Sequence, residues 1–144
     1  MRKIENIDIP FIIQTLYELH EESPVYNKVI PDEEYVINNL SNMINNDLFV
    51  SVIEPNKGYM FGAVQPNWYD PEYIGYEYIL FVRKQFRGGT LAIKLVHAFE
   101  KAVKDKGVNK LIVGSSTGIK DARTEFMYER LGYIREGNTL VKEL

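Results

Sequence analysis

The chain has 144 residues, of which 45% are hydrophobic and 26% charged, and these values favour a single globular domain with a buried core. It contains no Cys and only two His, which excludes disulfides and a Cys acyl-enzyme and argues against a metal site. A formal net charge of -3 argues against a dedicated nucleic-acid binder. There is no membrane-length apolar run and no signal-peptide core, so we expect a soluble, cytoplasmic protein.

The first half of the chain is predicted to form a short strand, two helices and a β-hairpin. The strand is expected at Met1 to Ile4. Asp8 is a suitable N-cap for a helix that extends to about His20, and Asp32 opens a second helix. The hairpin has strands 48–53 and 59–65 around a Pro-Asn-Lys-Gly turn.

The second half begins with an aromatic loop at 66–73 and then alternates strands with amphipathic helices. Gly107 is expected just past the end of the first of these helices. The expected elements are a strand at 74–82, a helix at 90–106, a strand at 110–113, a helix from Asp121 to Leu131, and a closing hairpin of 133–135 with 139–143.

This order predicts one α/β domain over residues 1–144. Its central sheet is expected to be mixed and mostly antiparallel, because a meander precedes a βαβ unit, and helices are expected on both faces. No internal repeat or linker divides the chain.

The turn between the strand at 74–82 and the following helix is predicted to bind an anion. It reads Arg87-Gly88-Gly89-Thr90-Leu91-Ala92. Adjacent glycines let backbone N–H groups approach a ligand, and a helix N-terminus adds unpaired donors with partial positive charge. A plain surface turn before a helix fits the same residues. Neither the Walker A pattern nor the dinucleotide fingerprint is present.

The loop resembles the acetyl-CoA pyrophosphate loop of the GCN5-related N-acetyltransferases (GNAT), which reads Arg/Gln-x-x-Gly-x-Gly/Ala at a strand-to-helix junction. Thr90 stands where the family usually has its middle glycine. The predicted order of elements is similar to that of the same family. The resemblance implies a GNAT-like acyl-CoA N-acyltransferase fold with acetyl-CoA as co-substrate. It also implies cofactor-binding roles for residues Arg87, Gly88, Gly89, Thr90, Leu91 and Ala92, and for the preceding strand at Leu80, Phe81 and Val82.

A second resemblance lies at the end of the last predicted helix, where Tyr128 begins the pattern Tyr-x-x-x-Gly-Tyr. The family often uses this tyrosine to protonate the departing thiolate, which implies a catalytic role for Tyr128. An aromatic side chain packed between helix and sheet is the alternative. Asp121 stands where the family often has a cofactor-binding Asn, and it also fits an N-cap.

Glu77 is the candidate general base, because an aromatic, half-buried setting between Tyr76 and Tyr78 would raise the pKa of its carboxyl group. Strand alternation does not decide whether it faces solvent, and an ordered water is the alternative base.

The acceptor is expected to be an amine, and a cationic one would suit the aromatic and acidic loop around Trp68 and Asp70. A protein amine, a polyamine, an amino-sugar and a modified nucleobase all remain open, as does a homodimer. The predicted activity is direct N-acetyl transfer from acetyl-CoA to a primary amine. The alternatives are a non-catalytic acyl-CoA sensor on the same fold and an interaction module for protein or nucleic acid.

Overall fold

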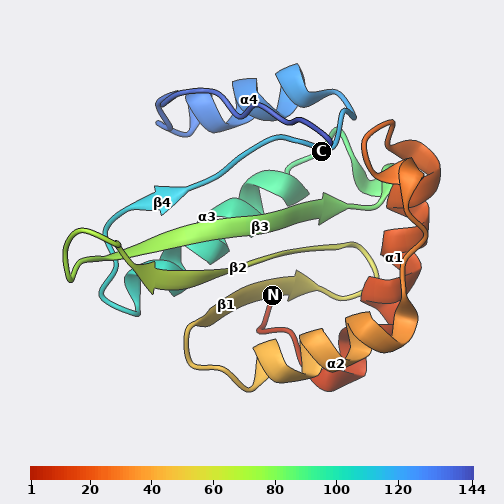
Figure 1. The fold of residues 1–144 in the computed structure, drawn as a ribbon, viewed down its shortest axis with the longest axis horizontal. Helices are drawn as coiled ribbons and strands as arrows, with labels where there is room; N and C mark the ends of the chain where they lie inside the picture. Colours follow the sequence, from red (N-terminus) through yellow and green to blue (C-terminus); the bar gives the residue numbers. More distant parts are fainter.

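The computed structural model describes residues 1–144 and shows a four-stranded sheet with helices on both faces (Figure 1). The strands follow one another across the sheet in the order β1 (Phe49–Glu54), β2 (Gly58–Pro66), β3 (Tyr73–Val82) and β4 (Leu111–Ile112). The first three are antiparallel neighbours, and β4 runs parallel to β3. The predicted mixed, mostly antiparallel sheet is therefore confirmed.

Four α-helices and three short 3-10 turns complete the fold. Asp32 stands at the start of one helix as predicted, and it also caps that helix, since its carboxylate accepts the Tyr35 N–H at 3.0 Å. Gly107 has a φ of +78° just past another, which suits a residue without a Cβ. The helices are α1 (Ile9–Glu22), α2 (Glu33–Ile44), α3 (Leu91–Lys104) and α4 (Asp121–Arg130), and the 3-10 turns are η1 (Asn6–Asp8), η2 (Tyr26–Lys28) and η3 (Lys84–Phe86).

Strand alternation divides the buried side chains into two cores, one on each face of the sheet. On the α3 face, Val52, Met60 and Val82 pack with Phe99 and with Tyr128 of α4. On the α1 face the strands meet α1 and α2, and the buried cluster there consists of Ile4, Ile9, Ile12, Leu19, Leu40, Ile53, Tyr59 and Phe81. The sheet is thus held from both sides, as its apolar strands require.

A β-bulge in β3 sets the direction of Glu77. Phe61 of β2 pairs with Ile79 and the next residue, Gly62, pairs with Glu77, so Tyr78 is the extra residue. Below the bulge Gly75 packs against Val103 of α3. Two residues further along the strand, Glu77 faces the same side as Gly75. Strand alternation in the sequence did not show which face Glu77 occupies, and the bulge decides it.

β3 and β4 part soon after they meet. Their pairing consists of Gly75 with Leu111 and Tyr76 with Ile112. From Tyr78 to Val82, β3 has no strand partner on the β4 side. This parting, called the β3–β4 gap below, opens toward the loops that lead into α3 and α4 (Figure 1).

Three local predictions need correction. The strand at Met1 to Ile4 is reduced to a single bridge between Arg2 and Ile53, because the Ile4 N–H donates to the Ser51 hydroxyl at 3.1 Å and not to a strand carbonyl. Asp8 holds the N-cap position of α1 as predicted, but its side chain makes no capping bond to that helix: the carboxylate accepts hydrogen bonds from Arg2 at 2.7 and 2.9 Å and from the Glu5 N–H at 2.9 Å, at the start of η1.

The closing hairpin is the third. Residues 133–144 form no strand, and Ile134, Leu140 and Val141 are exposed. A two-residue β4 offers too short an edge for such a hairpin to extend. None of the four α-helices has the length and apolarity that crossing a lipid bilayer demands.

Candidate active site

The base candidate Glu77 lies where β3 and β4 part. The backbone N–H of Gly114, just beyond β4, donates a hydrogen bond to its Oε2 at 3.0 Å. Burial raises the pKa of the Glu77 carboxyl group to about 7, although the N–H groups of Gly114 and Leu80 favour the anion. No cation pairs with it. A carboxylate with this pKa can take a proton near neutrality and release it again.

Tyr128 reaches the same side of the sheet from α4. The residue is 4% exposed, and its hydroxyl is buried without any hydrogen-bond partner. Burial raises the pKa of this hydroxyl, and the nearby Glu77 charge raises it further, so the phenol stays protonated at neutral pH. Buried hydroxyls in proteins are nearly always satisfied. An orphaned donor of this kind fits a site that a ligand completes.

Tyr133 supports the Tyr128 ring from behind. The two rings meet edge to face with centroids 5.1 Å apart. The Tyr133 hydroxyl donates to Glu100 of α3 at 2.8 Å, which secures the turn after α4 to α3. Packing thus accounts for the position of the Tyr128 ring but not for its unpartnered hydroxyl, and a catalytic role for Tyr128 stays a prediction.

The glycine loop follows η3 at the end of β3. Gly88 has a φ of +89°, which side chains rarely adopt. A Cβ on Gly89 would meet no atom within 4 Å, so open space lies beside its backbone. Thr90 is the N-cap of α3, and its hydroxyl makes no capping bond. Leu91 and Ala92 form the first turn of α3, whose N–H groups point into this loop.

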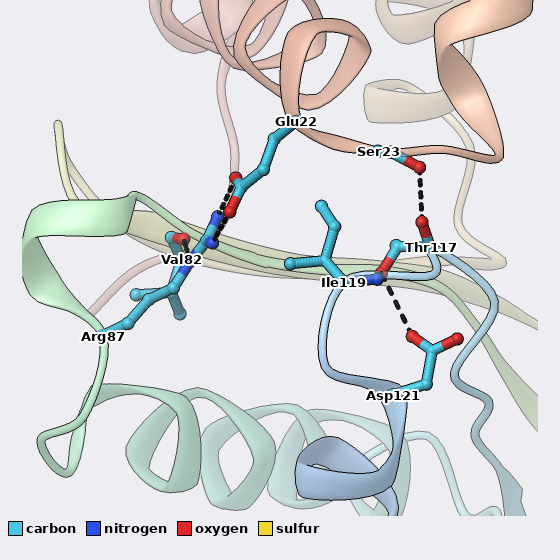
Figure 2. A network of polar contacts seen from close by, with 7 residues as sticks. All are labelled: Glu22, Ser23, Val82, Arg87, Thr117, Ile119 and Asp121. Atoms are coloured by element: carbon cyan, nitrogen blue, oxygen red, sulfur yellow. Dashed lines mark hydrogen bonds and ion pairs between the residues drawn. The ribbon is translucent and has the colours of Figure 1, made fainter.

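Arg87 is directed away from its own loop (Figure 2). Both Nη atoms bond the Glu22 carboxylate at the end of α1, with Nη2 at 2.9 Å, and Nε donates to the Val82 carbonyl at 2.7 Å. The guanidinium also lies over the Phe81 ring. Direct contact between Arg87 and a phosphate stays a prediction, and it would require the bond to Glu22 to open.

The rest of the predicted cofactor set is divided between edge and core. Leu80 and Val82 face α3 along the free edge of β3, whereas Phe81 is buried in the α1 core. Asp121 is not an N-cap, because Lys120 holds that position with a φ of +50°. Its carboxylate instead accepts the Gly118 N–H at 3.1 Å and the Thr117 hydroxyl at 3.3 Å. A cofactor contact by Asp121 stays a prediction.

Two residues of the site were missed from the sequence. Gly114 supplies the N–H to Glu77, and Arg123 of α4 lies beside the glycine loop, with Nη2 3.9 Å from where a Gly88 Cβ would be. Arg123 makes no ion pair in the structure, so its charge is available at the loop. No sequence signal separates it from the other 16 basic residues. No three His, Cys, Asp or Glu side chains gather where they could hold a metal ion.

Comparison with known proteins gives the class to which this fold and site belong. Residues 21–143 match the family model of the acetyltransferase (GNAT) domain. A search of curated protein sequences finds no significant match. Among solved structures, an acetyltransferase of Trypanosoma brucei matches with a TM-score of 0.74 at 21% identity, over 99% of this chain and 97% of the other.

Two further matches carry ligands. A predicted acetyltransferase of Clostridium acetobutylicum, solved with acetyl-CoA, has a TM-score of 0.72 at 17% identity, over 99% of this chain and 94% of that one. An aminoglycoside acetyltransferase from an uncultured soil metagenomic sample, solved with sisomicin, has a TM-score of 0.70 at 21% identity, with coverage of 99% and 94%. The protein is an acetyltransferase, and its chain belongs to the GNAT family.

Proposed function

We propose that this protein transfers an acetyl group from acetyl-CoA directly to a primary amine of a small molecule or a protein, with Glu77 as general base and Tyr128 as general acid. The observation that carries the proposal is the buried, unpartnered Tyr128 hydroxyl on the same side of the sheet as Glu77. A packing residue would have no need of that hydroxyl. A catalytic acid requires one that is protonated, shielded from water and free to donate.

The β3–β4 gap supports the placement of acetyl-CoA. β3 has no strand partner on the β4 side at Leu80 to Val82, and the backbone groups there that are not already bonded, as the Val82 carbonyl is to Arg87, can pair with the amides of the pantetheine arm, as an added strand would. The backbone N–H groups of Gly88, Gly89 and Thr90 and the first turn of α3 would receive the pyrophosphate, with Arg123 supplying positive charge. A backbone N–H of the same edge would stabilise the negative charge that develops on the thioester oxygen.

Glu77 would prepare the acceptor. A primary amine of the lysine type is mostly protonated at neutral pH and cannot attack a carbonyl until it loses a proton. An ionised Glu77 accepts that proton and passes it to solvent. Its pKa near 7 leaves a large share of the carboxyl groups ionised at neutral pH while keeping them basic enough to act.

Tyr128 would complete the exchange of bonds. As the amine nitrogen bonds to the acetyl carbon, the carbon–sulfur bond breaks and its electron pair moves to sulfur. The Tyr128 hydroxyl donates its proton to that sulfur, so that CoA leaves as a thiol. The attacking amine, now bonded to the acetyl carbon, loses its second proton. That proton returns to the Tyr128 phenol from the nitrogen side of the site, directly or through water.

The acceptor is proposed to be a cationic amine. The solved neighbour that binds sisomicin supports including aminoglycosides among the acceptors to be tested. The aromatic loop does not border the glycine loop, because the two lie at opposite ends of β3, about 30 Å apart for a ten-residue strand. Within the aromatic loop Asp70 is occupied by Asn67 and the Glu72 N–H, whereas Trp68 is 93% exposed. Trp68, together with Tyr69 at 66% exposed, is thus free to meet an acceptor.

The test is release of free thiol from acetyl-CoA in the presence of single amines. The panel contains an aminoglycoside, a polyamine, a lysine peptide and an amino-sugar, with an alcohol of similar size as the control. We expect thiol release that depends on one class of amine and on the enzyme concentration. Binding of acetyl-CoA without turnover on any of these amines would favour the acyl-CoA sensor instead.

A further inference from the structure

The C-terminal end of α1 crosses the β3–β4 gap and is fastened to both of its sides (Figure 2). This segment, Glu22 to Pro24, is called the α1 corner. On the β3 side, the Glu22 carboxylate accepts hydrogen bonds from both Nη atoms of Arg87, and Arg87 Nε donates to the Val82 carbonyl. The contact therefore reaches the last residue of β3 and the first residue of the glycine loop together.

On the β4 side, the Ser23 hydroxyl donates to the Thr117 carbonyl in the loop before α4. The same hydroxyl accepts the N–H groups of Val25 and Tyr26, each at 3.1 Å. One donor and two acceptor positions are thus all used, and Ser23 is 1% exposed. Loss of such a buried and fully bonded hydroxyl leaves its partners unsatisfied, which is costly.

Shape reinforces the second attachment. Gly118 has a φ of +70°, and a methyl group there would approach the Pro24 Cγ to 2.7 Å, so the loop and the corner are in close contact. Asp121 holds the same loop from the opposite side through the Gly118 N–H. The loop before α4 is thereby fixed between the α1 corner and α4.

These contacts matter because strand pairing stops at Tyr76 and Ile112, and beyond that point no ladder sets the spacing between β3 and β4. Apolar packing also spans the gap, since Ile119 of the loop before α4 lies against the core that contains Phe81 and Tyr128 packs with Val82. Apart from the Gly114 bond to Glu77, the α1 corner provides the polar link between the two sides of the gap. Glu22 and Arg87 are also partly shielded, with side chains 27% and 30% exposed. The hydrogen bond from Arg87 lowers the pKa of the Glu22 carboxyl group, which keeps the pair charged at neutral pH.

We infer that Glu22 and Ser23 are positioning residues, which hold the two sides of the β3–β4 gap at the spacing that acetyl-CoA requires. This inference rests on the proposed function, because it needs acetyl-CoA to occupy the gap. It assigns Arg87 a different role from the one its motif suggests: the side chain anchors the loop to α1, while the backbone of the loop meets the phosphates.

The experiment measures the dissociation constant of acetyl-CoA by calorimetry for Glu22→Gln, Ser23→Ala and the double variant, together with the unliganded melting temperature. The matched control is Asp105→Asn, which also removes one negative charge and one ion pair, to Lys101, at the opposite end of α3. Glu22→Gln preserves size and surface exposure, so it keeps the test valid if Ser23→Ala fails to fold.

We expect each single variant to raise the dissociation constant about five-fold or more, the lower end of coupling between sites, while the control stays within about two-fold. The dissociation constant of the double variant should rise by less than the product of the two single increases, because breaking either attachment already frees the α1 corner. Turnover at saturating acetyl-CoA should stay near that of the parent, since neither residue touches Glu77 or Tyr128.

Unchanged affinity in Glu22→Gln would overturn the inference, and so would tighter binding, which would mean that Glu22 masks a phosphate ligand. A parent protein that fails to bind acetyl-CoA would instead count against the proposed function. The two failures are therefore distinguishable in one set of titrations.

Discussion

The Gly114 N–H donates to the Glu77 carboxylate at 3.0 Å, across the point where β3 and β4 part. This bond takes the place of the strand pairing that ends two residues earlier on β4. It ties the base candidate to the loop before α4, and the Tyr128 hydroxyl lies near enough for the Glu77 charge to raise its pKa. The base candidate Glu77 and the acid candidate Tyr128 thus both lie where the pairing of β3 and β4 ends.

Burying Glu77 costs stability, so Glu77→Gln should stabilise the protein at high pH. Folding raises the pKa of this carboxyl group from 4.5 to about 7, so the folded state holds the proton more tightly and loses stability as pH rises between those values. Gln carries no charge and avoids this loss. The free energy of unfolding of the Glu77→Gln variant should exceed that of the parent by about 1–3 kcal/mol at pH 8 and match it at pH 4. Urea titrations at pH 4, 6 and 8 measure this, and equal stability at pH 8 would contradict the burial of a charge.

The same substitution should change the pH dependence of the rate. In the parent, kcat/KM should rise through a pH of about 7 as Glu77 ionises, because only the anion accepts a proton. Glu77→Gln should lose that step and fall most below the pH at which the acceptor amine deprotonates by itself. A loss that is equal at every pH, or no loss, would leave water as the base.

Gly89→Asp should abolish the thermal stabilisation that acetyl-CoA gives, while leaving the unliganded melting temperature unchanged. The site of its Cβ is open, so the fold tolerates a side chain, but the new charge would repel phosphate. Gly89→Ala adds bulk without charge and should show a smaller loss. Retained stabilisation by acetyl-CoA in Gly89→Asp would place the pyrophosphate elsewhere.

Arg123→Ala should weaken acetyl-CoA binding about ten-fold or more, since a hydrogen bond to a charged group contributes about 1.5–3 kcal/mol. Arg130→Ala is the matched control, because it removes the same charge from the same helix at the end away from the glycine loop. Equal dissociation constants for the two variants would mean that Arg123 contributes only general charge.

Much of the fold could be predicted because its signals are local. The hairpin of β1 and β2 has a Pro-Asn-Lys-Gly turn between alternating strands, and α3 has a continuous apolar stripe that ends before Gly107. The predicted closing hairpin had the same kind of local signal around Gly137. It failed because pairing also needs an edge, and the length of β4 depends on where it separates from β3.

The site was predicted only as far as its motifs reach. Glu77 and Tyr128 were identified as candidates, but the face of Glu77 depends on the bulge at Tyr78, which no local pattern reveals. The partner of Arg87 lies 65 residues away, on α1, and an ion pair at that separation leaves no mark in the sequence. The orphaned state of the Tyr128 hydroxyl is likewise a property of the packed structure.

Tyr128→Phe tests the central claim most directly. Phe keeps the ring against Tyr133 and removes a hydroxyl that has no partner, so the variant should be at least as stable as the parent and should bind acetyl-CoA with little change. If Tyr128 protonates the departing thiolate, thiol release at saturating acetyl-CoA and amine should fall about 10²-fold or more. Parental turnover in Tyr128→Phe, with chemistry shown to limit the rate, would contradict the account and leave Tyr128 as a packing residue.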